Sequence, residues 1–471
     1  MVFASLIFLY VFLPINLVLY YLLRSITARN LLLIGFSLAF YAWGEPVWVS
    51  LLIITSIVDY CHGLLIERFR GTVWAKAALA SSITINVGLL VGFKYSAFLC
   101  EIIGAALSTT VTVPTFALPI GISFYTFQAL SYVADVYRGD VPAQRSYIKF
   151  LLFISLYHQL VAGPIVRYAH IAGEVERRQH PIAGISAGVT RFCLGLFKKV
   201  CIANVAGLLV LRFMEADPAQ LSSAEAWFGL LMFSLQIYFD FSAYSDMAIG
   251  LGLMFGFHYH ENFDYPYIAR SATDFWRRWH ISLGSFFRDY VYIPLGGNRR
   301  RPYRNLFVVW GLTGLWHGAS WNFVLWGLYF AVLIALERLI LHRVLRALPA
   351  VVGHLYLLFA VVLGWALFYF DDLDRLGAYL QRMFGGGQQL TSGPGLEIVV
   401  REHCFWLALT LVMCAPLGPW LRRWFAAQAA HRPALAPWGA GVVTLVNLGA
   451  LILATAMLVG KTYNPFLYFR F

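Results

Sequence analysis

Charged side chains are scarce in this chain. Asp, Glu, Lys and Arg make up 12% of its 471 residues, whereas hydrophobic residues make up 60%. In a soluble protein of this length, charged residues make up roughly twice that share. The composition therefore excludes a soluble protein. Apolar runs recur from end to end, and about 20 apolar residues let a helix cross a hydrocarbon core roughly 30 Å thick. The sequence therefore predicts an all-α integral membrane protein.

Metal-binding and disulfide patterns are also missing. The six cysteines are scattered, mostly within apolar runs, and none forms a CxxC pair. Neither an HExxH motif nor a Walker loop occurs. His280, His317, Asp240 and Asp246 could in principle converge on a metal ion, but no HExxH-like spacing supports such a site. We therefore expect neither a bound metal nor a bound cofactor.

The net charge of +12 admits two interpretations. A basic chain can bind nucleic acid, but basic residues also accumulate in the cytoplasmic loops of membrane proteins. The second interpretation suits an apolar chain, so we expect no nucleic-acid partner. Two basic loops, 24–29 and 67–76, flank a helical hairpin bent at residues 44–46 and so belong on the same face. This places the N-terminus outside the cytoplasm.

Acidic residues interrupt the apolar segment 228–256. On a helix, Asp240 and Tyr244 share one face, whereas Ser242 and Asp246 share nearly the opposite one. Polar groups on two faces cannot both look into lipid. We therefore expect protein to surround this helix, with partners available to its carboxylates.

A first histidine, His280, follows a predicted helix start. Ser271 and Asp274 have the S-x-x-D form of such a start. In the single helix expected after them, one face carries an aromatic and apolar stripe: Trp276, His280, Leu283 and Phe287. An amphipathic helix of this kind can simply lie at the membrane interface as an anchor. An anchor, however, does not require a histidine.

Arginines accompany this histidine. Arg277 and Arg278 precede it within the weakly apolar stretch 258–304, where arginines outnumber acids. Guanidinium groups suit contact with phosphate. A solvated cytoplasmic loop is the alternative interpretation of such arginines.

A second histidine, His317, lies in GLTGLWHGASWNFVLWG. Gly314 and Gly318 have the small-xxx-small spacing that lets neighbouring backbones approach closely, so the imidazole is expected at a tight helix crossing. A histidine there can be purely structural. Imidazole is nonetheless the side chain best suited to proton transfer near neutral pH.

Long strings throughout the chain resemble those of a known family. They are MVFASLIFLYVFLP, LPIGISFYTFQ, AGPIVR, YFDFSAYSDMAIGLGLMFGF, ENFDYPY, DFWRRWHISL, FRDYVYIPLGGNR, GLWHGASWNFVLWG and NPFLYFRF. With these strings, the sequence resembles the membrane-bound O-acyltransferases, and within them the bacterial alginate O-acetylation branch. His317 lies in what resembles the family's hallmark histidine motif, and His280 in its second histidine motif. Gly284, where relatives often have serine, and Ala243, where they often have glycine, are small departures.

The resemblance implies both a fold and a reaction. The fold is a single transmembrane domain over residues 1–471, with a histidine-bearing core at about 227–345 and about 10–12 membrane-spanning helices. Re-entrant and interfacial helices complete it around a central funnel. The reaction moves an acetyl group from cytoplasmic acetyl-CoA through the bacterial inner membrane, with the N-terminus on the periplasmic side. Periplasmic SGNH-type acetyltransferases or acetyl-carrier proteins and membrane lipid are the implied partners. The modified polymer is alginate as first choice, while relatives act on cellulose, peptidoglycan or teichoic acid.

For the site, the resemblance and the residues together point to His317 and His280 as catalytic residues. His317 is a general base or a transient acyl carrier, and His280 orients groups or stabilises developing charge. The predicted substrate-binding residues are Arg277, Arg278, Trp276, Trp316, Asn322, Asp240 and Asp246. Two other classes stay open: a polysaccharide or lipid transporter, and a structural hub that recruits periplasmic enzymes.

Overall fold

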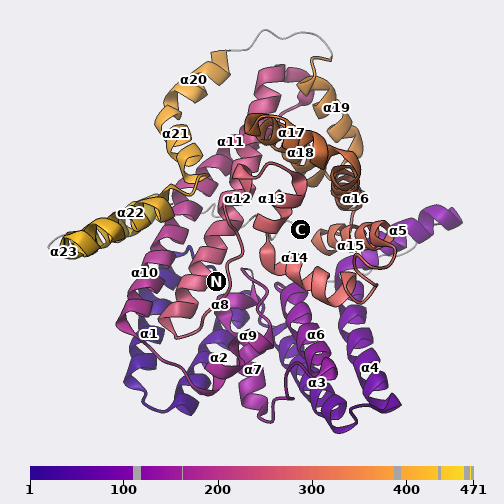
Figure 1. The fold of residues 1–471 in the computed structure, drawn as a ribbon, viewed down its shortest axis with the longest axis vertical. Coiled ribbons are helices and arrows are strands. Elements are labelled where there is room, and N and C mark those ends of the chain that lie inside the picture. Colours follow the sequence, from indigo (N-terminus) through magenta and orange to yellow (C-terminus); the bar gives the residue numbers. More distant parts are fainter. Residues whose placement is uncertain (110–117, 162, 387–393, 433–435, 461–466, 468–471) are drawn as a thin grey trace. The chain divides into compact units, whose positions relative to one another are not determined.

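The computed structural model describes residues 1–109, 118–161, 163–386, 394–432, 436–460 and 467. All regular elements in these ranges are helices (Figure 1), which confirms the predicted all-α class. Two of the strings above fall partly outside them: NPFLYFRF, of which only Leu467 is described, and AGPIVR, which lacks Ala162.

The described chain divides into two compact units, each built from three segments. The first unit comprises residues 1–192, 244–261 and 285–294, and the second comprises residues 193–243, 262–284 and 295–471. The single transmembrane domain expected over residues 1–471 stays a prediction. Helices α10 (Ile182–Phe197), α12 (Ser223–Met254) and α14 (Ile281–Phe287) contribute residues to both.

The first unit contains the helical hairpin that the sequence predicts. Helix α2 ends at Gly44 and α3 begins at Val49, on either side of the expected bend. Helices α3, α4 and α6 pack side by side (Figure 1). The helices that lie wholly in this unit are η1 (Phe8–Phe12), α1 (Leu13–Leu22), α2 (Ile26–Gly44), α3 (Val49–Arg68), α4 (Val73–Leu90), η2 (Val91–Tyr95), α5 (Ser96–Leu107), α6 (Ile122–Arg138), α7 (Tyr147–Ser155), α8 (Tyr157–Leu160), α9 (Tyr168–Glu176) and η6 (Arg288–Tyr292).

The second unit contains both predicted histidine motifs. Its helices α15 and α16 form a tightly packed pair, and α18 packs against α16. The helices of this unit are η3 (Lys198–Ala203), α11 (Asn204–Met214), η4 (Pro218–Gln220), η5 (Pro266–Ile268), α13 (Ala272–Arg278), α15 (Pro302–His317), α16 (Trp321–Leu336), η7 (Glu337–Leu341), α17 (His342–Ala347), α18 (Ala350–Tyr369), α19 (Leu373–Met383), α20 (Pro394–Glu402), α21 (Cys404–Met413), α22 (Leu417–His431) and α23 (Ala436–Leu458).

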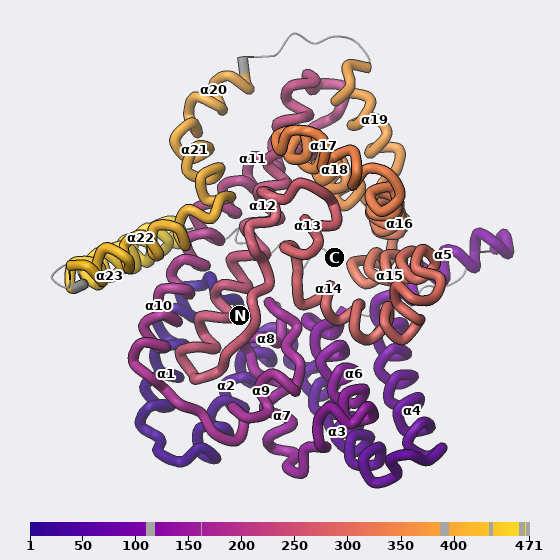
Figure 2. The backbone as a smooth tube through the Cα atoms, viewed as in Figure 1, coloured from indigo at the N-terminus to yellow at the C-terminus, as the bar shows by residue number. Residues whose placement is uncertain are grey.

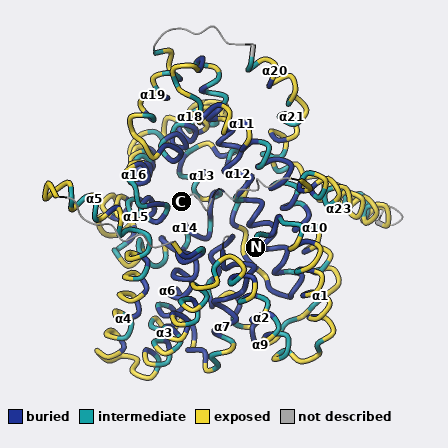
Figure 3. Tube along the Cα trace, turned by 180° about the vertical axis from the view of Figure 1, so that it is seen from behind, coloured by how far each residue is buried: buried dark blue, intermediate teal, exposed yellow. Residues whose placement is uncertain are grey.

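Helix α12 is much more buried than the C-terminal helices. Most residues of α12 are buried, whereas α22 and α23 are largely exposed (Figure 3). The buried residues of α12 include both Asp240 and Asp246. The prediction that protein surrounds this helix is therefore confirmed.

Among the described residues, seven helices are long and apolar enough to span a membrane: Ile26–Gly44, Val49–Arg68, Val73–Leu107, Ile182–Met214, Trp321–Ala347, Ala350–Tyr369 and Pro437–Leu458. An eighth is added if Cys404–Met413 and Leu417–His431, bent by 67°, form one span. The chain is thus a multi-pass membrane protein, with fewer such helices than the roughly 10–12 expected. The apolar run 148–167 accounts for part of the difference, because it is divided into the short helices α7 and α8.

Candidate active site

His317 is the last residue of α15 and is half-buried. Its ring centroid lies 4.9 Å from that of Trp316, 5.0 Å from that of Trp326 and 5.2 Å from that of Phe368. All three contacts are edge-to-face, the arrangement that aromatic rings prefer over direct stacking. The imidazole is therefore oriented by aromatic packing while part of it stays accessible.

Glycines bring α15 close to α16. A Cβ on Gly314 would lie 2.3 Å from the backbone oxygen of Phe323, and a Cβ on Gly327 would lie 2.4 Å from that of Trp310. A Cβ on Gly318 would lie 2.1 Å from the ring of Phe323. No side chain fits at such distances, so the close helix approach predicted at Gly314 is confirmed. The backbone packing fixes the position of His317 relative to α16.

His280 lies where a helix breaks. Helix α13 ends at Arg278 and α14 begins at Ile281, with a bend between them (Figure 2). The φ angle of His280 is 45°, in the left-handed region that is uncommon for residues other than glycine. The prediction of one continuous helix after Ser271 is therefore wrong. The prediction that Trp276 and His280 share one face of that helix is wrong for the same reason. The start of the helix is confirmed, because the Ser271 side chain accepts a hydrogen bond from the Asp274 N–H.

A distant segment stabilises this break. The N–H of Ile281 donates to the backbone oxygen of Asn262 (3.0 Å), and the N–H of Ser282 donates to its side-chain oxygen (3.1 Å). On the other side of the break, the N–H of Asp264 donates to the carbonyl of Arg278 (2.9 Å). Interrupting a helix leaves backbone groups without intrahelical partners. Residues 262–264 satisfy three of these groups and so compensate for the interruption.

The His280 side chain is almost fully buried, at 2% exposure. Its ring centroid lies 4.6 Å from that of Phe241 and 5.9 Å from that of Trp316. Its Nδ1 lies 3.5 Å from the Ser282 hydroxyl, which donates to the Asn262 side chain. Trp316 therefore contacts both imidazole rings. The structure places the two predicted catalytic histidines in one aromatic cluster.

Two further predicted site residues, Trp276 and Asn322, belong to the same region. The ring centroid of Trp276 lies 5.4 Å from that of Trp326, which in turn contacts His317. Asn322 is fully buried, and its amide nitrogen lies 3.4 Å from the backbone oxygen of Phe368. Asn322 thus connects the start of α16 to the end of α18 and supports Phe368 against His317.

The two aspartates of α12 each form an ion pair. The Asp240 carboxylate lies 2.6 Å from the Lys199 ammonium in the second unit. Asp246 lies 2.7 Å from the Arg191 guanidinium in the first unit, and Arg191 also pairs with Glu261. These contacts give both carboxylates a structural role. A part in substrate binding stays a prediction for each.

The two predicted arginines differ in their surroundings. Arg278 donates to Asp274 (3.0 Å) and to Asp264 (3.2 Å), so its guanidinium helps to hold the segment before His280. Arg277 is exposed. Of the pair, Arg277 has the more accessible charge for a ligand.

Sequence reasoning missed three residues that contact or support the predicted site residues. Trp326 contacts His317 directly, Lys199 pairs with Asp240, and Asn262 braces His280. Trp326 could have been found from its spacing of four after Asn322, which places both on one face of α16. Nothing in the local sequence around Lys199 or Asn262 indicates which distant residue each contacts.

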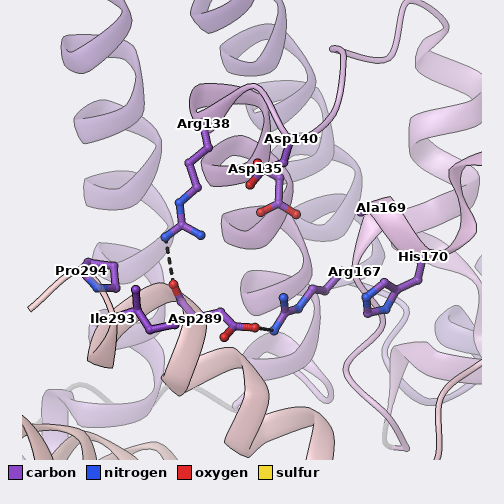
Figure 4. Close-up of a pocket in the computed structure, with 9 residues that line it drawn as sticks. All are labelled: Asp135, Arg138, Asp140, Arg167, Ala169, His170, Asp289, Ile293 and Pro294. Carbon is purple, nitrogen blue, oxygen red and sulfur yellow. Dashed lines mark hydrogen bonds and ion pairs between the residues drawn. The ribbon is translucent and has the colours of Figure 1, made fainter. Parts of the chain in front are cut away.

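A separate charged pocket of about 540 Å³ lies within the first unit (Figure 4). Arg167 donates to the Asp289 carboxylate (2.8 Å), and Arg138 donates to the backbone oxygen of Asp289 (2.9 Å). Both guanidinium groups lie 4.9 Å from the ring centroid of Tyr290. The residues lining the pocket are Asp135, Arg138, Asp140, Arg167, Ala169, His170, Asp289, Ile293 and Pro294.

Within the described part of the chain, no group of three or more His, Cys, Asp or Glu side chains is placed to hold a metal ion. The histidine cluster itself offers two imidazoles, indole N–H donors and aromatic walls.

Comparisons with known proteins point to the same family as the histidine motifs. Residues 141–376 match the membrane-bound O-acyltransferase family. The chain is 37% identical to a probable alginate O-acetylase of Azotobacter vinelandii, over the full length of both chains. It is 42% identical to the corresponding protein of Pseudomonas aeruginosa, covering 82% of this chain and 75% of that one. A peptidoglycan O-acetyltransferase of Helicobacter pylori is 32% identical, covering 82% of this chain and 80% of that one.

The family match includes both histidine motifs, and the full-length relatives extend the similarity over the whole chain. The chain therefore belongs to the membrane-bound O-acyltransferase family and is a multi-pass membrane O-acyltransferase.

Proposed function

We propose that this protein moves acetyl groups across a bacterial inner membrane for the O-acetylation of an exported polysaccharide, with alginate as the first candidate. The observation that carries the proposal is the half-buried imidazole of His317, which contacts the indole rings of Trp316 and Trp326. The names of the Azotobacter and Pseudomonas relatives support the acetyl group and the polymer.

His317 acts at the reaction centre in one of two ways. As a general base it takes the proton of an acceptor hydroxyl, whose oxygen attacks the acetyl carbonyl carbon. As a nucleophile its own nitrogen attacks this carbon and carries the acetyl group as an acyl-imidazole. In both cases the carbon–sulfur bond of the thioester breaks, and the sulfur leaves as the thiolate. His280 assists by orienting groups or stabilising the developing charge.

The donor in this proposal is cytoplasmic acetyl-CoA. Its thioester end reaches His317, while its phosphates stay near the arginine-rich residues 258–304. The exposed side chain of Arg277 supports this assignment, because guanidinium groups bind phosphate well. A variant with both Arg277 and Arg278 replaced by alanine should need more acetyl-CoA for the same rate. Unchanged donor dependence would leave these two arginines as structural residues.

On the far side, the acceptor is a periplasmic SGNH-type acetyltransferase or acetyl carrier of a polysaccharide-secretion system. The basic loops 24–29 and 67–76 support a cytoplasmic face for that end of the first unit and a periplasmic N-terminus. Labelled acetyl-CoA supplied to membranes, with and without the neighbouring periplasmic proteins, identifies the acceptor by what becomes labelled.

The decisive variant is His317→Ala, tested in the same membranes. It should abolish transfer of the label while the protein level and membrane insertion persist. His403→Ala is the matched control, because His403 is also half-buried in the second unit but is not placed at the site. Normal transfer by His317→Ala would refute the assignment.

A second acceptor polymer is supported by the Helicobacter relative, a peptidoglycan O-acetyltransferase. The chemistry at His317 is the same, and only the periplasmic partner differs. Label found in peptidoglycan but not in secreted polysaccharide would favour this alternative over alginate.

A further inference from the structure

Several buried polar atoms around the histidines make no hydrogen bond within the described part of the second unit. They are Nε1 of Trp276, Nε1 of Trp326, Nε2 of His280 and Oδ1 of Asn322. A buried polar atom without a partner costs free energy, and buried indole N–H groups usually find an acceptor. Four such atoms in one cluster point to a ligand that supplies their partners.

Other indole groups of the same unit are satisfied. The N–H of Trp365 donates to the Tyr267 hydroxyl (3.2 Å), that of Trp227 to the Met383 carbonyl (3.0 Å), and that of Trp406 to the Cys201 carbonyl (2.8 Å). The packing of this unit therefore does provide acceptors for tryptophan. The unmatched donors belong to Trp326, which contacts His317, and to Trp276, which contacts Trp326.

Trp326 is the best placed of these donors. Its side chain is 1% exposed, and its ring centroid lies 5.0 Å from that of His317 and 5.4 Å from that of Trp276. The close packing of α15 against α16 at Gly314 and Gly327 holds it in this position. The indole is therefore oriented by the fold before any ligand binds.

The indole N–H determines which kind of ligand atom can bind to it. Indole can only donate a hydrogen bond, so it pairs with an acceptor and not with an ammonium or another donor. The acceptor that arises during acyl transfer is the carbonyl oxygen of the acyl group. This oxygen becomes negative when a nucleophile adds to the carbonyl carbon, and preorganised donors stabilise it most in a site that excludes water.

We propose that the indole N–H of Trp326, with that of Trp276 beside it, forms the oxyanion-binding site for the acyl group transferred at His317. The inference rests on the proposed function. When the nucleophile adds to the thioester carbon, the π electron pair moves to oxygen and the Trp326 N–H donates to it. The pair then reforms the carbonyl as the carbon–sulfur bond breaks and the thiolate leaves.

The test removes the N–H while keeping the ring. Trp326→Phe does this with a smaller ring, and 3-benzothienylalanine at position 326 keeps the bicycle with sulfur in place of N–H. Trp365→Phe is the matched control, because Trp365 is equally buried in the same aromatic cluster but donates to Tyr267. Acetyl transfer from labelled acetyl-CoA is measured in membranes, with thermal unfolding of each variant in detergent.

Both Trp326 variants should lose about 10²–10³-fold in kcat, as when one donor of an oxyanion site is removed, with little change in KM. Trp365→Phe should keep its kcat even if its melting temperature falls. If Trp326→Phe does not fold, the benzothienyl variant decides the question, since it preserves the shape of the side chain.

A folded benzothienyl variant with a kcat within threefold of the wild type would overturn the inference. So would an equal loss of kcat in folded Trp365→Phe. His317→Ala in the same assay separates this result from a failure of the proposed function. If His317→Ala is active, the reaction centre is elsewhere; if it is inactive while both Trp326 variants are active, only the oxyanion assignment fails.

Discussion

The ammonium nitrogen of Lys199 lies 2.6 Å from a carboxylate oxygen of Asp240, and the two side chains are only 6% and 2% exposed. The other carboxylate oxygen accepts the backbone N–H of Leu467 at 2.7 Å. One buried acid thus connects α12 to η3 and to a residue near the C-terminus. The Lys199–Asp240 ion pair is separate from the contacts of the two histidines. It stabilises α12, and Phe241 on this helix contacts His280.

Removing one partner of this ion pair should be costly. Asp240→Ala leaves the Lys199 charge buried without its carboxylate, which should reduce the free energy of unfolding by about 3–5 kcal/mol. The double variant Lys199→Met with Asp240→Leu should lose much less, because neither charge remains. Thermal unfolding in detergent measures both. Asp264→Ala is the control, since its pair with Arg278 is far more exposed. Equal losses in the single and double variants would contradict the prediction.

The glycine contacts between α15 and α16 give a second prediction. Gly327→Ala places a methyl group against the backbone oxygen of Trp310, and overpacking of this kind typically costs about 1–3 kcal/mol. Acyl transfer should fall as well, because Trp326 and His317 lie on the two displaced helices. Gly311→Ala on α15 meets no atom within 4 Å and should be neutral or stabilising by up to about 1 kcal/mol. Melting temperatures that do not separate the two variants would show that the helices can move apart.

The backbone of His280 gives a third prediction. With φ at 45°, a β-branched residue there is strained, whereas asparagine tolerates this region better. His280→Val should therefore be less stable than His280→Asn, by about 1–2 kcal/mol. Unfolding in denaturant compares the two. Both variants should lose acyl-transfer activity if the imidazole takes part in the reaction; full activity in folded His280→Asn would remove His280 from the mechanism.

The pocket of the first unit gives a fourth prediction. Asp289 pairs with Arg167 (2.8 Å) and with Arg288 (2.6 Å). Asp289→Ala leaves the largely buried Arg167 without its carboxylate, which should cost about 1–3 kcal/mol. Asp140→Ala alters an exposed carboxylate that lines the same pocket and should change stability by less than about 0.5 kcal/mol. Thermal unfolding distinguishes the two, and a larger effect at Asp140 would mean that Asp289 is not the central acid of this network.

Much of the architecture could be predicted because it depends on local pattern. The hairpin bend at residues 44–46 and the helix start at Ser271 follow from glycine, proline and capping residues that act on their own neighbours. The close approach of α15 at Gly314 follows from residue size and helical spacing. The burial of Asp240 and Asp246 on two faces of α12 follows from the same periodicity.

The break at His280 shows where local pattern fails. The segment 274–287 has the spacing of one amphipathic helix and contains no proline. What interrupts it is the distant segment 262–264, whose polar groups pair with the backbone on both sides of the break. A local pattern cannot include hydrogen bonds from another part of the chain, so it predicts a continuous helix.

The sequence alone was sufficient for the all-α membrane class, for the two histidine motifs and for the acyltransferase resemblance, because composition and short strings carry this information. Only the tertiary structure decided which side chains meet at the site. The contacts of Trp316 with both imidazoles, of Trp326 with His317 and of Lys199 with Asp240 join different helices. Such contacts depend on how helices pack against one another, and side-chain periodicity along a single helix leaves that choice open.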